Sequence, residues 1–264
     1  GPLARSPEDL EIAMNVLAAP QGQDEIAWSI NLPKPKVTDV TKLKVAVWPE
    51  EKSAEVDEEI TKLINDTAED LKSAGAKVET VAPPFTFDEM DDIYSKLVHP
   101  IMSAGGDKET LATADALAGE LDDSDMSELA KITRGVSLRA RDYVVNNARR
   151  HFIKQKWLKF FEKYDVMLSP VCAVPAFKHN HDPLIERTIN VNGKEKQYWH
   201  TTIWAGPVVT ANLPSTSTPI GLTSSGLPVN LQIIGPYLHD LTCIEVAKMI
   251  RDLRGGFRIP PNFQ

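Results

Sequence analysis

Cysteine is scarce in this sequence: Cys172 and Cys243 are the only two in 264 residues. Two cysteines so far apart cannot build the disulfide framework that stabilises many small secreted domains. The first residues, GPLARSPEDL, also lack the charged, apolar and small segments of a secretory signal peptide. We therefore expect a protein of a reducing compartment, with a cytoplasmic location.

Long hydrophobic runs and clusters of positive charge are also missing. No apolar stretch approaches the roughly 18 residues that a membrane-spanning helix needs, so we expect no membrane span. The 37 acidic residues outnumber the 29 basic ones, and the net charge is −8. A protein that binds nucleic acid usually carries a clustered basic face, so we expect no nucleic-acid partner. Apolar and charged contents of 42% and 25% are typical of a globular chain.

The sequence motifs of several enzyme classes are absent as well. There is no Gly-x-Ser-x-Gly elbow, no Ser-x-x-Lys, no phosphate-binding glycine loop and no paired zinc spacing. The densest group of possible metal ligands, His179-Asn180-His181-Asp182, lies in a polar segment without a matching cluster elsewhere, and a solvated loop explains it better. We therefore assign no catalytic residue, no metal ligand and no cofactor to this chain.

Hydrophobic periodicity predicts a strand, a helix and a second strand near the start of the chain. Ser6, Pro7 and two acidic residues begin a helix that extends to about residue 18. A proline-containing loop over 20–42 follows. Residues 43–48 and 77–81 then read as strands on either side of a helix with an apolar stripe over 60–71. A connection of this length predicts two parallel strands joined by a right-handed crossover.

The rest of the chain mixes helices and strands. We predict helical structure over 88–119 and 127–163, a strand over 165–169 and an irregular polar insert at about 178–200. Two further strands and a helix over about 239–252 follow, and Val229, Leu231 and Ile233 alternate along the second of these strands. This order predicts an α/β fold with a mixed β-sheet flanked by helices.

Four residues are candidates for the wall of a substrate pocket. Val171 and Cys172 follow the predicted strand over 165–169, and strand ends in α/β folds often face ligands. Cys172 has no convincing histidine partner in sequence, so pocket lining or plain packing explains it better than a nucleophilic role. Ile203 and Trp204 belong to the segment WHTTIW, for which a core position and an apolar pocket wall remain open as alternatives.

Three stretches together resemble the C-terminal half of the amidase-signature amidohydrolases. They are GPLARSPEDLEIAMNVLA at the start, KYDVMLSPVCAVPAF in the middle and TPIGLTSSGLPVNLQIIGPYLHD near the end. The resemblance covers essentially all of residues 1–264 and implies the C-terminal portion of a single amidase-like domain. Val209, Asn212 and Asn230 depart from the family pattern, which often has Asn at the first position and Gly at the other two.

The resemblance implies hydrolysis of the carbon–nitrogen bond of small carboxylic amides. Family members use a serine nucleophile, a bridging serine and a lysine base, which stand before the GPLARS segment and so are expected upstream of residue 1. An amide carbonyl is a poor electrophile, so without an activated nucleophile and oxyanion donors we expect this chain alone to be inactive.

Three interpretations of what this chain is remain open. It is part of an amidohydrolase that also contains the missing N-terminal half, it docks onto a separate polypeptide that carries the catalytic residues, or it is a non-catalytic amidase-like protein that binds a ligand or a partner. If the chain is a fragment, its uncovered sheet edges and apolar faces predict self-association when it is made alone.

Overall fold

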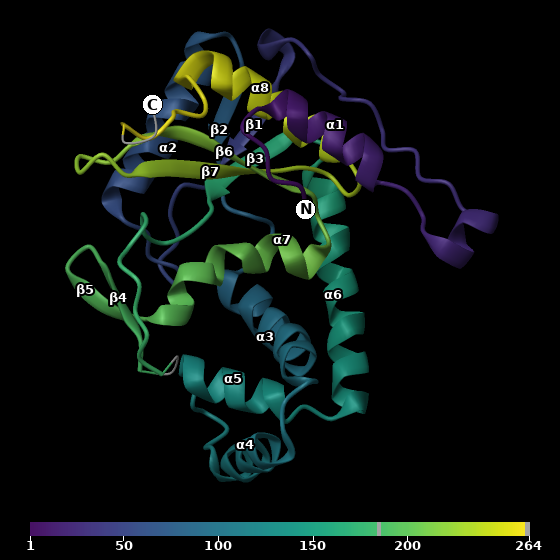
Figure 1. Ribbon diagram of the computed structural model, residues 1–264, viewed down its shortest axis with the longest axis vertical. Coiled ribbons are helices and arrows are strands. Elements are labelled where there is room, and N and C mark those ends of the chain that lie inside the picture. The colour runs from purple at the N-terminus through teal and green to yellow at the C-terminus, as the bar shows by residue number, and fades with distance from the viewer. Residues whose placement is uncertain (184–185, 262–264) are drawn as a thin grey trace.

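A five-stranded mixed sheet forms the centre of the protein, in a computed structural model that describes residues 1–183 and 186–261. The strand order is β2-β1-β3-β7-β6 (Figure 1). The strands are β1 (Lys44–Val47), β2 (Lys77–Thr80), β3 (Val166–Pro170), β6 (Ser215–Leu222) and β7 (Pro228–Ile234). β1 is parallel to both β2 and β3, whereas β7 is antiparallel to β3 and to β6. The mixed sheet that the sequence predicts is therefore confirmed.

The crossover between β1 and β2 is confirmed as well. Helix α2 (Glu58–Ser73) joins the two strands, and Asp57 caps its first turn by accepting a hydrogen bond from the N–H of Glu59. The stripe predicted over 60–71 buries Ile60, Ile64 and Leu71 in the core. Gly75, at a φ of +102°, follows the helix and turns the chain into β2, a conformation that glycine adopts without strain.

Helices cover both faces of the sheet. α2 and α8 (Asp240–Arg254) lie on one face, and α3 (Phe87–Ser103) and α7 (Gly206–Ala211) lie on the other (Figure 1). The long helix α6 (Ala140–Phe160) runs from the sheet past α3, towards α5 (Glu128–Val136) and α4 (Lys108–Glu120). β3 is buried along its whole length, so the core lies around the middle of the sheet.

The two long helical predictions are each divided in the structure. The segment predicted over 88–119 breaks at Gly105-Gly106, and Asp107 caps the new helix α4 by accepting from the N–H groups of Glu109 and Thr110. The segment predicted over 127–163 breaks between α5 and α6. No glycine or proline marks residues 137–139, where the chain passes from one helix to the next.

The polar insert over 178–200 is more regular than the sequence predicts. It contains the antiparallel hairpin of β4 (Thr188–Val191) and β5 (Lys194–Gln197), so its irregular assignment was wrong there. Asn192 and Gly193 both have positive φ at the turn, as a two-residue hairpin requires. The insert continues into a 3₁₀ helix, η3 (Tyr198–Ala205). Residues 184 and 185 lie outside the described residues.

Gly135 sets how closely α5 approaches α3. A Cβ atom at this position would lie 2.8 Å from Cβ of His99 and 3.0 Å from the carbonyl oxygen of Ser95. We expect Gly135→Ala to lower the free energy of unfolding by about 1–3 kcal/mol, because the two helices would have to separate. Gly119→Ala, in α4 with nothing within 4 Å, is the matched control and should be neutral or stabilising by up to about 1 kcal/mol. Urea unfolding followed by circular dichroism measures both, and equal effects would contradict the close contact.

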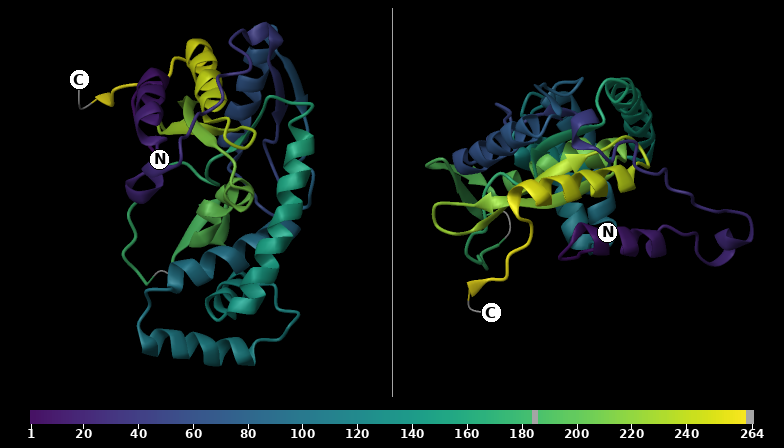
Figure 2. Two further views of the ribbon diagram at one scale, coloured as in Figure 1. Left: turned by 90° about the vertical axis from the view of Figure 1, so that its right-hand side faces the viewer. Right: turned by 90° about the horizontal axis from the view of Figure 1, so that it is seen from above.

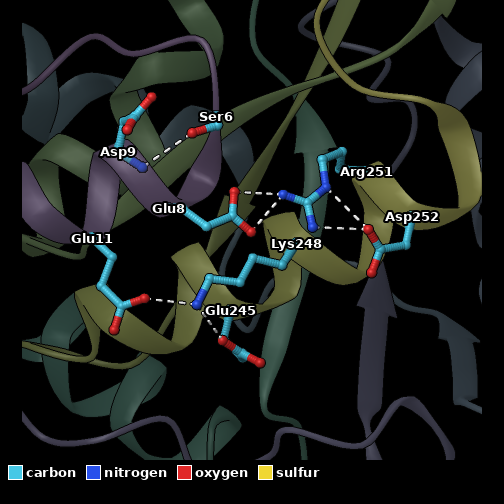
Figure 3. Close-up of polar contacts among 8 residues, drawn as sticks. All are labelled: Ser6, Glu8, Asp9, Glu11, Glu245, Lys248, Arg251 and Asp252. Carbon is cyan, nitrogen blue, oxygen red and sulfur yellow. Dashed lines mark hydrogen bonds and ion pairs between the residues drawn. The ribbon is translucent and has the colours of Figure 1, made fainter.

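The first helix is held against the last by ion pairs. α1 (Pro7–Leu17) begins at Ser6, whose hydroxyl accepts from the N–H of Asp9, as the sequence predicts. α1 lies along α8 (Figure 2). Nη1 of Arg251 in α8 donates to both carboxylate oxygens of Glu8, at 2.5 and 2.6 Å, and Nζ of Lys248 lies 2.7 Å from Glu11 (Figure 3).

These ion pairs make the attachment of α1 dependent on pH. The hydrogen bonds from Arg251 lower the pKa of Glu8 below its ordinary value of 4.5. Because the folded-state pKa is the lower one, the pair contributes fully above pH 4.5 and is lost as the pH falls through the lowered value. Hydrogen exchange in residues 7–17 measures this loss once it is corrected for its intrinsic pH dependence. We expect the exchange to accelerate below pH 4.5, as Glu8 becomes protonated.

Substitutions separate this effect from general acid unfolding. Glu8→Gln should accelerate exchange in α1 already at pH 7. Asp252→Asn is the control, because Asp252 also binds Arg251 but belongs to α8 itself. Equal exchange in the two variants would show that the Glu8 pair does not hold α1.

Candidate functional site

The predicted pocket residues Val171 and Cys172 lie directly after β3. Both side chains are half-buried. Cys172 packs against a small apolar cluster that joins the chain after β3 to the hairpin, made of Val174, Ile189 and Val191. Burial raises the pKa of the Cys172 thiol, so the sulfur is protonated at neutral pH and is a weak nucleophile.

Ile203 and Trp204 lie near the end of η3. Trp204 is fully buried, and its ring centroid is 4.6 Å from that of Trp48. Its indole Nε1–H donates to the carbonyl oxygen of Ala54 at 3.1 Å. Ile203 is partly buried against the same core. The indole of Trp204 therefore packs in the core of this chain, and its prediction as a pocket wall stays a prediction.

Gln232 connects the two predicted pairs of residues. This side chain on β7 is almost fully buried, and its Nε2 donates to the carbonyl oxygens of Pro170 at 2.8 Å and Trp204 at 2.9 Å. Its Oε1 accepts from the hydroxyl of Ser215 at 3.1 Å. One amide thus holds the end of β3, where Val171 begins, next to η3. Gln232 was not predicted from the sequence; the available signal was a polar residue alternating with Leu231 and Ile233 in a buried strand.

A polar and partly uncovered stretch of the sheet lies beside Gln232. Ser215, Ser217 and Asn230 alternate onto the same face of β6 and β7, and all three are exposed. The hydroxyl of Ser217 accepts from the amide of Asn230 at 3.3 Å. The hydroxyls of Ser215 and Ser217 are therefore bonded to amides, which cannot remove a proton as a general base does. The arrangement can form a wall or a binding surface, but it contains no activated nucleophile.

Two pockets beside the β4–β5 hairpin are lined by other residues. An open groove of about 1050 Å³ lies between α2, the loop after β1 and the hairpin. There Lys194 and Lys196 hold the pKa of Glu55 at about 2, so its carboxylate is ionised and anchors the hairpin. A second pocket of about 460 Å³ lies at the insert and includes Val174 and Tyr198. The four predicted residues line neither of them.

The rest of the described chain adds no metal-binding or membrane-spanning feature. Within residues 1–183 and 186–261, no group of three or more His, Cys, Asp and Glu side chains is placed to hold a metal ion. His179 and His181 lie with ring centroids 6.3 Å apart on exposed chain. Over the same residues, none of the helices is both long and apolar enough to cross a bilayer.

Comparison with known proteins identifies the fold. A glutamyl-tRNA(Gln) amidotransferase subunit from Thermotoga maritima superposes with a TM-score of 0.70 at 21% identity, covering 96% of this chain and 52% of that one. A bacterial aryl acylamidase of the amidase signature enzymes superposes with a TM-score of 0.67 at 22% identity, covering the same shares. The mixed sheet and its flanking helices are thus those of amidase-signature enzymes.

Sequence comparison gives the family. The family model described as Amidase matches residues 1–244, and the chain therefore belongs to the amidase family, as the three sequence stretches predict. The corresponding glutamyl-tRNA(Gln) amidotransferase subunit from an Exiguobacterium species is 30% identical over 98% of this chain and 56% of that protein. The chain spans about half the length of the curated relatives that it matches.

Proposed function

We propose that this chain is the C-terminal half of an amidase, and that the intact protein hydrolyses the carbon–nitrogen bond of a small carboxylic amide. The observation that carries the proposal is the family match over residues 1–244 in a chain that spans only about half of its relatives. The serine nucleophile, the bridging serine and the lysine base would then belong to the other half of the fold.

The chemistry of the described residues near Gln232 supports the proposal that the catalytic groups belong to the other half of the fold. Amide hydrolysis needs a nucleophile activated by a base and donors for the developing oxyanion. Near Gln232 the serine hydroxyls are bonded to amides, and the Cys172 thiol has a raised pKa. Binding without an activated nucleophile gives no turnover, so this half would supply sheet strands and part of the substrate wall.

Val171, Cys172 and Ile203 would contribute to that wall, with Trp204 behind them. Gln232 fixes the two backbone segments that carry these residues, so the distance between them is set by a buried amide. A largely apolar wall discriminates one methylene only weakly. The relatives' names also refer to different substrates, an aryl acylamide, a fatty acid amide and glutamyl-tRNA, and therefore do not single out one amide.

Exposed apolar side chains on α6 also support a missing half. Val144, Val145, Phe152 and Leu158 are each more than half exposed, whereas Ile153 and Trp157 of the same helix are buried. Large exposed apolar patches often mark surfaces that another part of a fold or a partner covers. The other half of the fold would cover these side chains.

Amide turnover by two forms of the protein tests the proposal. One form is the encoded polypeptide with everything that precedes Gly1, and the other is the 264-residue chain, each assayed on simple aliphatic and aryl amides. We expect turnover by the first and none above background by the second. Equal turnover per chain would place the nucleophile within residues 1–264, and inactivity of both forms would favour a non-catalytic, ligand-binding role.

A further inference from the structure

Residues 54–58, at the junction between the loop after β1 and helix α2, contact both segments of the candidate wall. The N–H of Asp57 donates to the carbonyl oxygen of Ala173 at 2.9 Å, in the chain that follows β3. The carbonyl oxygen of Ala54 accepts from the indole of Trp204 at 3.1 Å, near the end of η3. We call residues 54–58 the bridging segment, because they join these two parts of the chain.

Three consecutive carbonyl oxygens of the bridging segment, at residues 54–56, accept hydrogen bonds from side chains. After the bond from the indole, Nε2 of His200 binds the carbonyl oxygen of Glu55 at 2.8 Å. A carbonyl oxygen only accepts, so the proton of this bond belongs to the imidazole. Nδ2 of Asn192 donates to the third carbonyl oxygen, that of Val56, at 2.9 Å. In the part of the chain that the structure describes, none of the three accepts from a backbone N–H, so their partners are these side chains.

The polar insert holds the bridging segment at further points. Oδ1 of Asn192 accepts from the N–H of Glu58 at 3.0 Å, in the first turn of α2. Because Asn192 lies in the turn of the β4–β5 hairpin, the tip of the hairpin is attached directly to the bridging segment. Lys194 and Lys196 add ion pairs to Glu55 at 2.8 and 3.1 Å.

The two segments of the candidate wall are therefore linked at two places. Gln232 binds the end of β3 and the carbonyl oxygen of Trp204 from the sheet. The bridging segment binds Ala173 and the indole of Trp204 from the loop after β1. Gln232 is almost fully buried, whereas Asn192 is exposed and His200 is half-buried. Substitutions in the second link therefore move the wall with less damage to the core.

We propose that Asn192 and His200 are positioning residues for amide binding, which act through the bridging segment to fix the distance between the wall segments that contain Val171 and Ile203. The proposal rests on the function proposed above, in which these two segments face the substrate. Neither positioning side chain contacts the amide. A wall held about 1 Å too loosely binds its ligand less tightly, while the catalytic groups of the other half stay in place.

Steady-state kinetics of two variants test this role. The protein is the encoded polypeptide with everything that precedes Gly1, and the substrate is whichever simple aliphatic or aryl amide it hydrolyses fastest. We expect Asn192→Gly and His200→Leu to raise KM at least about fivefold and to leave kcat within about twofold, because the wall supplies binding rather than chemistry. Glycine retains the positive φ of the hairpin turn. Variants with a lower kcat and an unchanged KM would show only a loss of folded enzyme and would overturn the proposal.

A conservative variant and a control separate the contact from the hairpin itself. His200→Gln keeps an N–H donor at a similar reach, so its KM should stay within about twofold of the parent value. Asn190→Ala is the control, because Oδ1 of Asn190 accepts from the N–H of Gly193 inside the hairpin. A rise in KM as large as that of Asn192→Gly would assign the effect to the hairpin alone and refute the role of the bridging contact.

Alkylation of Cys172 tests the positioning without any amide. Cys172 directly precedes Ala173 and is half-buried, whereas Cys243 is fully buried and serves as an internal reference for unfolding. With iodoacetamide, followed by mass spectrometry, we expect Asn192→Gly and His200→Leu to accelerate the modification of Cys172 at least about threefold and to leave Cys243 unmodified. Equal acceleration at both cysteines would indicate general unfolding and contradict a local role.

The two measurements also separate this proposal from the proposed function. Faster alkylation of Cys172 in a protein that hydrolyses no amide would overturn the function and support the role of the bridging segment in fixing the wall. Amide turnover with unchanged KM and unchanged alkylation in both variants would overturn the positioning alone.

Discussion

Trp204→Ala is expected to lower the free energy of unfolding by about 3–5 kcal/mol, the usual cost of removing a large aromatic side chain from a packed core. The indole is fully buried between Trp48 and Phe87. Its removal leaves a cavity and also leaves the carbonyl oxygen of Ala54 without its donor. Because Trp204 follows directly from Ile203, the loss would also loosen the predicted pocket segment.

Trp28→Ala is the matched control for this substitution. Trp28 is 71% exposed, so the same chemical change should alter stability by no more than about 0.5 kcal/mol. Urea unfolding followed by circular dichroism avoids the change in tryptophan fluorescence that both variants share. A Trp204→Ala variant within about 1 kcal/mol of the parent would contradict the core position of this residue.

Gln232→Leu is expected to cost about 2–4 kcal/mol, although leucine is similar in size and more apolar. The substitution leaves the carbonyl oxygens of Pro170 and Trp204 without a donor in a buried site, and an unpaired buried acceptor costs about 1–3 kcal/mol. Asn230→Leu is the control, because Asn230 lies two residues away on the same strand face but is exposed. It should change stability by no more than about 0.5 kcal/mol.

Gln232→Glu adds a test with a defined sign. An ionised carboxylate there would accept but not donate, and it would face two carbonyl oxygens. Its pKa would be raised by burial, so protonation as the pH falls should restore part of the lost stability. A Gln232→Glu variant that is destabilised equally at pH 5 and pH 8 would contradict the donor role of this side chain.

The sequence predicted those helices and strands whose ends are set by residues within the same element. Ser6 and Pro7 marked the start of α1, and the apolar stripe of α2 between two short strands gave the parallel crossover. Each of these signals acts within one turn of a helix or one strand. They could be interpreted without knowledge of the rest of the molecule.

The features that the sequence did not predict depend on contacts between distant segments. The end of α5 lies where Gly135 meets His99 of α3, a contact that periodicity does not encode. The hairpin in the polar insert is held by Glu55, far away in the chain, through Lys194 and Lys196. Each of these elements is defined by a partner that a short sequence window does not include.

The candidate site likewise combines features that local sequence predicts with features that depend on distant contacts. Val171 and Cys172 were selected because they follow a strand, and the structure places them at the end of β3. Their connection to Ile203 and Trp204 depends on Gln232, 28 positions beyond Trp204, and on the order of strands in the sheet. The role of these four residues in substrate binding remains a prediction that requires the other half of the fold.

Labelling with a fluorophosphonate probe decides whether the hydrolytic groups lie outside residues 1–264. We predict that the 264-residue chain alone shows no labelled serine by mass spectrometry, whereas the encoded polypeptide is labelled at a serine that precedes Gly1. A stoichiometrically labelled serine within the 264-residue chain alone would place the nucleophile in this half and refute the proposed division between the two halves.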